Sequence, residues 1–202
     1  DCYATGGGTV QLPTGTFAVT GLTIYWGSKI TVNLKGAGPK ATFLTKLGTT
    51  SSAILDLAAS SNAVEVYSTI SDLSLIGNAR CSNGITATGC AYLTLQNLIV
   101  ADCAVGIDFQ GSLISDLERV CALNNNTGMR FRAAGCLYPN LISIKKGALR
   151  GNSSWGMDFG DGSGLSVEGV DIEANGVFND QDTGGIVTRS TYGSETGYGI
   201  LS

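Results

Sequence analysis

The sequence predicts an all-β domain in which short strands wind into a solenoid, and three observations support this prediction. The 202 residues include 29 glycines and only 14% charged residues, a composition that favours short strands and tight turns over helices. A glycine followed by an apolar residue recurs along the second half of the chain, and a polar residue with turn propensity precedes each such glycine. The length suits one domain with a sizeable core.

The glycine repeat marks successive coils of the predicted solenoid. Its intervals are 22, 22, 28 and 29 residues, and the five glycines are Gly84, Gly106, Gly128, Gly156 and Gly185. Three repeats are nearly the same tetrapeptide: GIDF at 106–109, GMRF at 128–131 and GMDF at 156–159. Side chains alternate between the two faces of a strand. We therefore expect an inward ladder of Ile107, Phe109, Met129, Phe131, Met157 and Phe159, and an outward ladder of Asp108, Arg130 and Asp158.

Two further columns accompany the glycines. A polar column, in turns where the side chain can hydrogen-bond the backbone, consists of Asn78, Asp102, Asn124, Asn152 and Asn175. An apolar column consists of Leu73, Leu98, Val120, Ala148 and Val170. At roughly 3.3 Å per residue, a 22-residue repeat makes about three short strands with their turns, which is one coil. Each coil can satisfy its strand hydrogen bonds only by stacking on the next coil.

Other repeat architectures fit the sequence less well. Helical repeats need runs of good helix formers at a spacing of about 3.6 residues, whereas Gly, Asn, Ser and Thr interrupt this chain at short intervals. Leucine-rich repeats need a short consensus of fixed period, whereas the interval here grows from 22 to 29 residues. A β-solenoid remains the predicted fold class.

Charge and residue types exclude several functional classes. With 12 basic and 16 acidic residues the net charge is −4, so the chain lacks the basic footprint of a nucleic-acid-binding protein. The absence of histidine excludes a Ser-His-Asp or Cys-His nucleophile system and a His-ligated zinc site. Acid–base chemistry therefore falls to carboxylates, Lys or Tyr, and we expect no metal and no cofactor. Apolar stretches such as 91–101 have about half of the roughly 20 residues that a membrane span needs, so we expect no membrane partner.

Six cysteines occur without a CxxC pair or a zinc-like spacing. We interpret them as mostly free, small, buried hydrophobic residues, with structural disulfides as the main alternative. They are Cys2, Cys81, Cys90, Cys103, Cys121 and Cys136.

The first coils resemble a known family. Residues 6–17 read GGGTVQLPTGTF and residues 34–42 read LKGAGPKAT. This glycine cluster, double strand and L-x-G-x-G turn resemble the opening of the pectate-lyase-like right-handed parallel β-helix superfamily and, within it, of bacteriophage tailspikes and depolymerases. The resemblance implies a right-handed, single-stranded parallel β-helix of roughly seven to nine coils. It also implies that 1–5 is the remnant of an N-terminal cap, and that 1–202 is a single domain and a fragment of a longer spike polypeptide.

The resemblance also implies a setting for the protein. Tailspikes bind a cell-surface polysaccharide, form homotrimers, contact other tail proteins and lie in the virion tail; a secreted protein is the alternative. Outward apolar residues such as Ile99 and Leu149 are expected to be covered by a partner. The same opening precedes hydrolases, lyases and inactive spikes alike, so it does not define a reaction.

The best-marked active sites of this superfamily are absent from the sequence. There is no histidine, no adjacent Asp pair and no Arg-x-Lys of the polygalacturonase type, and no calcium-type pectate lyase signature. Arg130 lies between Asp108 and Asp158 and is a candidate substrate-binding residue, although a stabilising surface ladder is the preferred interpretation of this column. A second ladder of alternating sign is expected at Glu118, Lys146 and Glu168.

Acidic residues are concentrated in one segment. Seven carboxylates and no Lys or Arg lie between Arg150 and Arg189, so this segment has a charge of −7 and the remainder, with 12 basic and 9 acidic residues, +3. Glycoside hydrolysis needs two carboxylates roughly 5 to 10 Å apart, and crowded carboxylates raise one another's pKa. The candidate catalytic residues are Glu168, Asp171, Glu173 and Asp180, and the candidate substrate-binding residues are Trp155, Tyr192, Arg130 and Asp158. The alternatives are solvated surface charges and a cation site within 158–164.

Three functional hypotheses follow from these patterns. The first is a tailspike-like protein that binds and depolymerises a cell-surface polysaccharide by carboxylate-based hydrolysis. The alternatives are a non-catalytic structural or receptor-binding spike, and a secreted polysaccharide lyase or epimerase. An enzyme predicts a carboxylate pair with a raised pKa beside aromatic residues, whereas a structural spike predicts carboxylates that pair with Lys or Arg on neighbouring coils.

Overall fold

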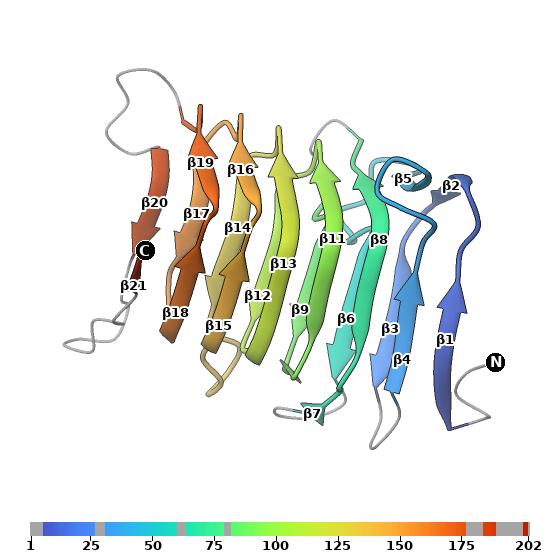
Figure 1. Cartoon of the computed structure of the whole chain (residues 1–202), viewed down its shortest axis with the longest axis horizontal. Coiled ribbons are helices and arrows are strands. Elements are labelled where there is room, and N and C mark those ends of the chain that lie inside the picture. Colours follow the sequence, from blue (N-terminus) through green and yellow to red (C-terminus); the bar gives the residue numbers. More distant parts are fainter. Residues whose placement is uncertain are drawn as a thin grey trace.

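The protein is a right-handed parallel β-helix, as the sequence predicts. The computed structural model describes residues 6–26, 31–59, 64–78, 82–176, 184–188 and 200–201, and these residues contain strands and turns but no helix. Parallel strands stack into two sheets that enclose a single apolar core (Figure 1). None of the described residues forms a helix that could cross a bilayer.

The smaller sheet, sheet B, receives one strand from each coil. Its strands stack in the order β20, β17, β14, β12, β9, β6 and β3. Seven stacked strands in the described part of the chain correspond to about six complete turns, which is below the seven to nine coils that were expected. The strands are β3 (Leu22–Trp26), β6 (Leu55–Ala59), β9 (Ile85–Thr88), β12 (Val105–Gln110), β14 (Thr127–Arg132), β17 (Trp155–Phe159) and β20 (Gly184–Thr188).

The larger sheet, sheet A, bends along its length. In the middle coils the bend lies within one long strand, and in the coils towards both ends it divides the strand into two. The long strands are β8 (Thr69–Ile76), β11 (Thr94–Ala101) and β13 (Leu113–Leu123). The divided and short strands are β1 (Gly7–Gln11), β2 (Gly15–Val19), β4 (Thr31–Lys35), β5 (Thr42–Lys46), β7 (Val64–Glu65), β10 (Cys90–Ala91), β15 (Asn140–Lys145), β16 (Ala148–Arg150), β18 (Ser163–Glu168), β19 (Asp171–Glu173) and β21 (Ile200–Leu201).

The inward ladder of the core is confirmed. Phe109 and Phe131 stack with ring centroids 5.3 Å apart, and Phe159 continues the column at 5.6 Å from Phe131. All three rings are buried, and the apolar residue two positions earlier in each strand is buried in register beside them. Because apolar burial contributes about 25 cal/mol per Å² and each aromatic ring buries a large area, this column is a major source of stability.

A ladder of buried amides explains why glycine recurs. The Nδ2 group of Asn125 donates to Asn152 Oδ1 at 3.2 Å, and that of Asn152 donates to Asn175 Oδ1 at 2.8 Å. A Cβ added to Gly106, Gly128 or Gly156 would lie 2.8–2.9 Å from the amide nitrogen of this ladder and 2.4–2.7 Å from the carbonyl oxygen of the next glycine. Any side chain would therefore push the coils apart, and glycine is required for close approach.

The predicted polar and apolar columns need correction by one residue in places. Asn152 and Asn175 belong to the amide ladder, but Asp102 and Asn124 precede it and occupy a bend with positive φ angles of 58° and 55°. Cys121 pairs with Ala148, so Gly147, not Ala148, lies opposite Val120 in the apolar column. The error arises because bend and ladder positions are adjacent, and Asn and Asp suit both of them. Leu149, which the sequence suggested as an outward apolar residue for a partner to cover, is instead fully buried.

Left-handed backbone conformations recur at three corners of the coil. The first corner column consists of Tyr67, Tyr92, Ile114, Leu141 and Gly164. The second corner column consists of Asp72, Asn97, Arg119, Lys146 and Gly169. The third corner column consists of Asp102, Asn124, Gly151 and Ala174. At each corner the same backbone conformation repeats from coil to coil and turns the chain.

Four of the cysteines lie in the described residues, and all four are free. Cys90 and Cys103 are buried, and burial raises the pKa of each thiol to about 12, so both behave as inert hydrophobic residues. Cys136 departs from the expectation because it is exposed. Cys2 and Cys81, like the predicted cap remnant at 1–5, lie outside the described residues.

Candidate functional site

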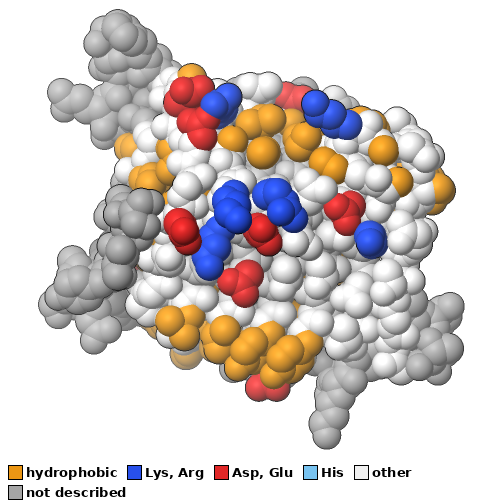
Figure 2. Space-filling model, in the orientation of Figure 1, with side chains coloured by type: hydrophobic (Ala, Val, Ile, Leu, Met, Phe, Trp, Pro, Cys, Tyr) orange, Lys and Arg blue, Asp and Glu red, His pale blue; other side chains and the backbone are white. Residues whose placement is uncertain are grey.

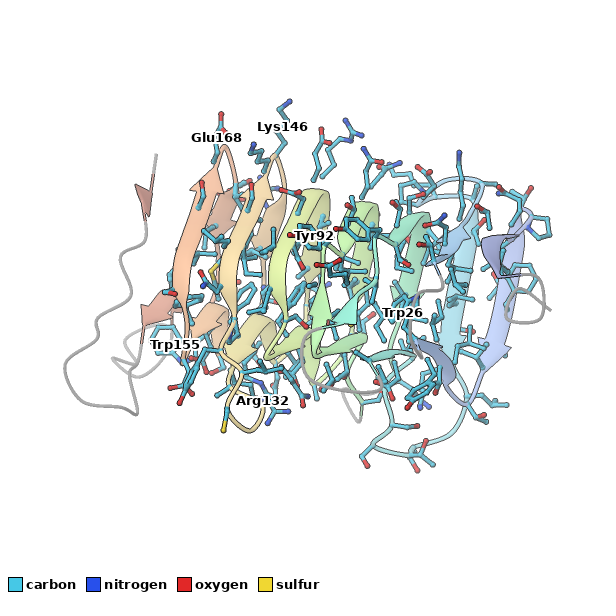
Figure 3. The ribbon with its side chains drawn as sticks, turned by 90° about the horizontal axis from the view of Figure 1, so that it is seen from below. Trp26, Tyr92, Arg132, Lys146, Trp155 and Glu168 are labelled. Carbon is cyan, nitrogen blue, oxygen red and sulfur yellow. The ribbon has the colours of Figure 1, made fainter. Side chains whose placement is uncertain are left out.

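The two outer faces of the β-helix separate the candidate residues. Figure 3 shows Glu168 and Lys146 projecting from the face of sheet A, whereas Arg132 and Trp155 lie on the opposite side, at sheet B. The structure therefore does not bring the candidate residues together in one site. Asp180 and Tyr192 lie outside the described residues.

On sheet A, the carboxylates of β19 pair with a cation of the neighbouring coil. Parallel pairing places Ala148 opposite Asp171 and Arg150 opposite Glu173. Arg150 bridges both acids, with Nη2 directed at Asp171 and Nε 3.2 Å from Glu173 Oε1. Figure 2 shows this mixed-charge group over β16 and β19. All three side chains are exposed, so each pair contributes about 0 to 1 kcal/mol. This is the pairing between neighbouring coils that a structural surface predicts.

The second charge ladder on sheet A exists, with one residue corrected. In the parallel register of β13, β15 and β18, Glu118 lies opposite Lys145 and Lys145 lies opposite Glu168. The central cation of the ladder is therefore Lys145 and not Lys146. Lys146 occupies the second corner column, where the backbone turns with a φ of 55°. Charged side chains of both signs consequently extend across the middle of this face (Figure 2).

The outer face of sheet B presents two parallel columns of mainly polar side chains. The first column consists of Thr23, Asp56, Thr86, Asp108, Arg130 and Asp158. The second column consists of Tyr25, Ala58, Thr88, Gln110 and Arg132. The predicted outward ladder of Asp108, Arg130 and Asp158 is thereby confirmed in register. Backbone hydrogen bonds hold both columns, so their side chains start from fixed positions about 4.8 Å apart.

Asp108 is the centre of this face. It is fully buried beneath two guanidinium groups: Arg130 donates from Nε at 3.1 Å and Nη2 at 2.9 Å, and Arg132 from Nε at 3.2 Å and Nη2 at 2.8 Å. Gln110 and Asn83 donate to the same carboxylate at 2.9 and 3.3 Å. Burial alone would raise the pKa of Asp108, but the hydrogen bonds and charges of the two arginines outweigh it and lower the pKa. Asp108 therefore stays ionised and orients both arginines.

Asp56 has the opposite environment on the same face. It is half-buried, and burial raises the pKa of its carboxyl group. No hydrogen bond or ion pair joins its side chain to another described residue. Asp56 and Asp108 lie two strands apart, which corresponds to about 9.6 Å. This face thus combines a carboxyl group that holds its proton more readily with a carboxylate that stays charged.

Three residues of this face were not predicted as site residues from the sequence. Arg132 lies two residues after Arg130, so strand alternation could have placed it beside Asp108. Asp56 and Tyr25, with Tyr25 56% exposed, lie in early coils that the glycine repeat does not reach. Trp155 begins β17 on sheet B and is half-buried, so it shares this sheet with Arg130 and Asp158 but not with Glu168.

The acidic residues do not gather into a metal site within the described part of the chain. No group of three or more Asp, Glu or Cys side chains there could hold an ion together. Asp158 and Asp161, the carboxylates of the alternative cation segment at 158–164, each take part in interactions within the protein.

Comparison with known proteins identifies the fold. No protein-family model and no curated protein sequence matches the chain. An ORF18 product of Geobacillus virus E2 is similar in structure with a TM-score of 0.62 and 18% identity, over 84% of this chain and 32% of that one. An alginate lyase from Paenibacillus has a TM-score of 0.66 and 16% identity, over 80% and 58%. The catalytic unit of an α-1,3-glucanase from Streptomyces thermodiastaticus has a TM-score of 0.61 and 14% identity, over 93% and 41%.

These likenesses confirm the right-handed parallel β-helix predicted from the opening coils. The chain spans between a third and three fifths of the length of these three proteins. At this level of identity the similarity concerns the fold, and the site has to be argued from the residues themselves.

Proposed function

We propose that this chain is the β-helix of a tailspike-like protein and that it binds a cell-surface polysaccharide along the outer face of sheet B. The observation that supports this most is the buried Asp108, which holds the guanidinium groups of Arg130 and Arg132 side by side on a rigid sheet. Planar guanidinium groups fixed in this way can donate several hydrogen bonds to hydroxyl or carboxylate oxygens of a sugar.

The neighbouring residues suit the same ligand. Gln110, Thr86 and Thr88 add hydrogen-bonding groups, and the exposed Tyr25 adds an aromatic surface at the N-terminal end of the face. The side chains stand on strands, so little conformational entropy is lost when a chain of sugars binds along them. A flat face of this kind favours an extended polymer over a small molecule.

The comparisons support the proposal at a coarser level. Two of the similar structures are described as an alginate lyase and an α-1,3-glucanase, and a third as ORF18 of Geobacillus virus E2. We extend these descriptions to this chain as a proposal: a polysaccharide ligand, a location in the virion tail, a homotrimeric spike and contacts with other tail proteins. A secreted polysaccharide lyase or epimerase remains the alternative setting.

Binding of polysaccharide tests the proposal. Alginate, an α-1,3-glucan and bacterial cell-surface polysaccharides form the panel, and affinity is measured by calorimetry with wild type and Arg132→Ala. Asp108 keeps Arg130 as a partner in this variant, so the fold should persist while affinity falls about tenfold or more, which equals about 1.4 kcal/mol. Arg119→Ala, at an exposed arginine of sheet A, is the matched control and should bind like wild type. Equal losses in both variants, or no binding to any polysaccharide, would refute the proposal.

Hydrolysis is the second candidate, and the raised pKa of Asp56 favours it. A protonated carboxyl group can donate a proton to a glycosidic oxygen. Asp108 lies at a distance of about 9.6 Å, but the six hydrogen bonds to its oxygens leave it unable to take a proton from water. The base of this candidate reaction is therefore another carboxylate. Glu168, Asp171 and Glu173 lie on sheet A, on the opposite side of the β-helix from Asp56, so they cannot act together with it. Of the predicted catalytic residues, only Asp180, which lies outside the described residues, is retained as the proposed base.

A reducing-end assay distinguishes the candidates. Asp56→Asn should abolish the release of new reducing ends while polysaccharide binding persists. Ultraviolet absorbance of an unsaturated product would instead indicate a lyase. Binding without either product would leave a non-catalytic receptor-binding spike.

A further inference from the structure

Lys46 is a buried lysine that no carboxylate neutralises. It ends β5, near β2 in Figure 1, and its side chain contacts the turn that joins β2 to β3 and the loop that leads to β6. The residue is only 6% exposed. Within the described part of the chain, no Asp or Glu forms an ion pair with it. Because a charge removed from water without an opposite charge is costly, this position favours the neutral amine.

The hydrogen-bond partners of Lys46 suit that neutral amine. Its Nζ atom lies 2.5 Å from Thr20 O, 2.7 Å from Ser52 O and 2.7 Å from Ser52 Oγ. The two carbonyl oxygens only accept hydrogen bonds, whereas the hydroxyl group can also donate. A neutral amine has two N–H groups for the carbonyls and one lone pair, which accepts the proton of the Ser52 hydroxyl group. Burial also lowers the pKa of Lys46.

Ser52 has the features of a nucleophile. It is exposed, so it can meet a molecule from solution, whereas its partner Lys46 is shielded. Thr50 Oγ1 lies 3.1 Å from Ser52 Oγ and adds a second hydroxyl group to the pair. The backbone N–H group of Ala53 donates to no described residue, and in α/β-hydrolases the N–H group that follows the nucleophile binds the oxyanion. Because the chain contains no histidine, lysine is the side chain that can serve a serine as its base.

We propose that Ser52 and Lys46 form a nucleophile–base pair that hydrolyses carboxylic esters of small acyl groups. Ser52 Oγ transfers its proton to Lys46 Nζ and bonds to the carbonyl carbon of the ester, and the C–O bond to the alcohol then breaks. Lys46 returns the proton to the departing alcohol oxygen, which leaves an acyl group on Ser52. Water, deprotonated by Lys46, attacks that acyl group, and the proton returns to Ser52 Oγ as the acid departs. One ester and one water thus give one acid and one alcohol.

The position of the pair indicates where its natural ester would come from. Ser52 lies just before β6, and Asp56 in that strand belongs to the outer face of sheet B. Acyl groups on the hydroxyls of a bound polysaccharide are therefore the substrate we assign to the pair, and this part of the inference rests on the proposed function. Hydrolysis of a small free ester does not depend on it. A lysine that only holds the loop and the turn together would use the same two carbonyl oxygens, so the test has to follow chemistry at Ser52.

Two probes test the pair in the full chain. A fluorophosphonate should add covalently to Ser52, and peptide mass spectrometry locates the adduct. With p-nitrophenyl acetate, Ser52→Ala should release p-nitrophenol at least tenfold more slowly than wild type, while the thermal midpoint stays unchanged because Lys46 keeps both carbonyl partners. Ser51→Ala, at the neighbouring exposed serine, is the matched control and should react like wild type. The rate that depends on Ser52 should rise with pH through an ionisation below the ordinary lysine pKa of about 10.4, because the neutral amine is the base.

Each outcome bears on the inference. Equal rates of ester hydrolysis for wild type and Ser52→Ala would overturn it, and so would a fluorophosphonate reaction that leaves Ser52 unmodified. If Ser52 reacts as expected but no polysaccharide binds to sheet B, the proposed function fails and the ester chemistry stands. If a polysaccharide binds while Ser52 stays inert, the proposed function stands and this inference fails.

Discussion

The change Asp108→Asn probes the central feature of sheet B. Asparagine preserves the shape of the side chain but removes its charge and points an amide N–H group towards guanidinium donors. The carboxylate accepts four hydrogen bonds from Arg130 and Arg132, at 2.8–3.2 Å, within a fully buried position. Hydrogen bonds to a charged group contribute about 1.5 to 3 kcal/mol each.

The expected loss is smaller than the sum of those hydrogen bonds. The two arginine side chains remain 31% and 45% exposed, so water can solvate them once the carboxylate is lost. We therefore expect Asp108→Asn to reduce the free energy of unfolding by about 2 to 4 kcal/mol at neutral pH. Urea unfolding followed by circular dichroism measures the loss. Asp116→Asn, at an exposed carboxylate of sheet A, is the control and should stay within about 0.5 kcal/mol of wild type.

The pH dependence of this loss tests the cause. Because the pKa of Asp108 is lowered in the folded state, its stabilisation is fully present above the unfolded pKa of about 3.9 and disappears as the pH falls through the folded pKa. The difference between wild type and Asp108→Asn should therefore shrink in acid. A difference below about 0.5 kcal/mol at neutral pH, or one that is equally large in acid, would refute the reasoning.

Three further substitutions test other parts of the structure. Asn152→Ala removes the hydrogen bonds that join Asn125 to Asn175 through the amide ladder and leaves buried groups unpaired, so urea unfolding should show a loss of about 2 to 4 kcal/mol. Phe131→Ala opens a cavity between two rings and should cost about 3 to 5 kcal/mol; a loss below 1 would contradict the stacked core. Asp56→Asn should be more stable than wild type at neutral pH, by less than about 1 kcal/mol, because the raised pKa means that ionisation opposes folding. The two proteins should become equally stable in acid, and a variant less stable than wild type at neutral pH would show that the carboxylate has a partner.

The fold and the core ladder could be predicted because their motif has no insertions. The tetrapeptides that begin at Gly106, Gly128 and Gly156 place the phenylalanines in register whatever the loop lengths, and the structure confirms this. The registers of Asp102 and Lys146 were wrong by one residue. Both residues occupy a left-handed corner next to the expected column. The rule that side chains alternate along a strand makes no allowance for the extra residue that turns the chain, so it shifts the predicted register by one.

The candidate site was harder to predict because a solenoid separates residues that are close in sequence. The acidic segment looks like one cluster along the chain, but its coils distribute Asp158 to sheet B and Asp171 with Glu173 to sheet A, where Arg150 pairs with both. Arg150 lies at the edge of the acidic segment in sequence, so the imbalance of charge is partly neutralised between neighbouring coils.

Mapping the contact surface of bound polysaccharide tests the central claim most directly. Hydroxyl-radical footprinting with mass spectrometry compares the oxidation of Tyr25 on sheet B with that of Tyr67 and Leu141 in the first corner column, all of which are exposed. Each residue is measured with and without a polysaccharide that binds. The account predicts that the sugar protects Tyr25, while Tyr67 and Leu141 react as before. Protection confined to residues outside the outer face of sheet B would contradict it.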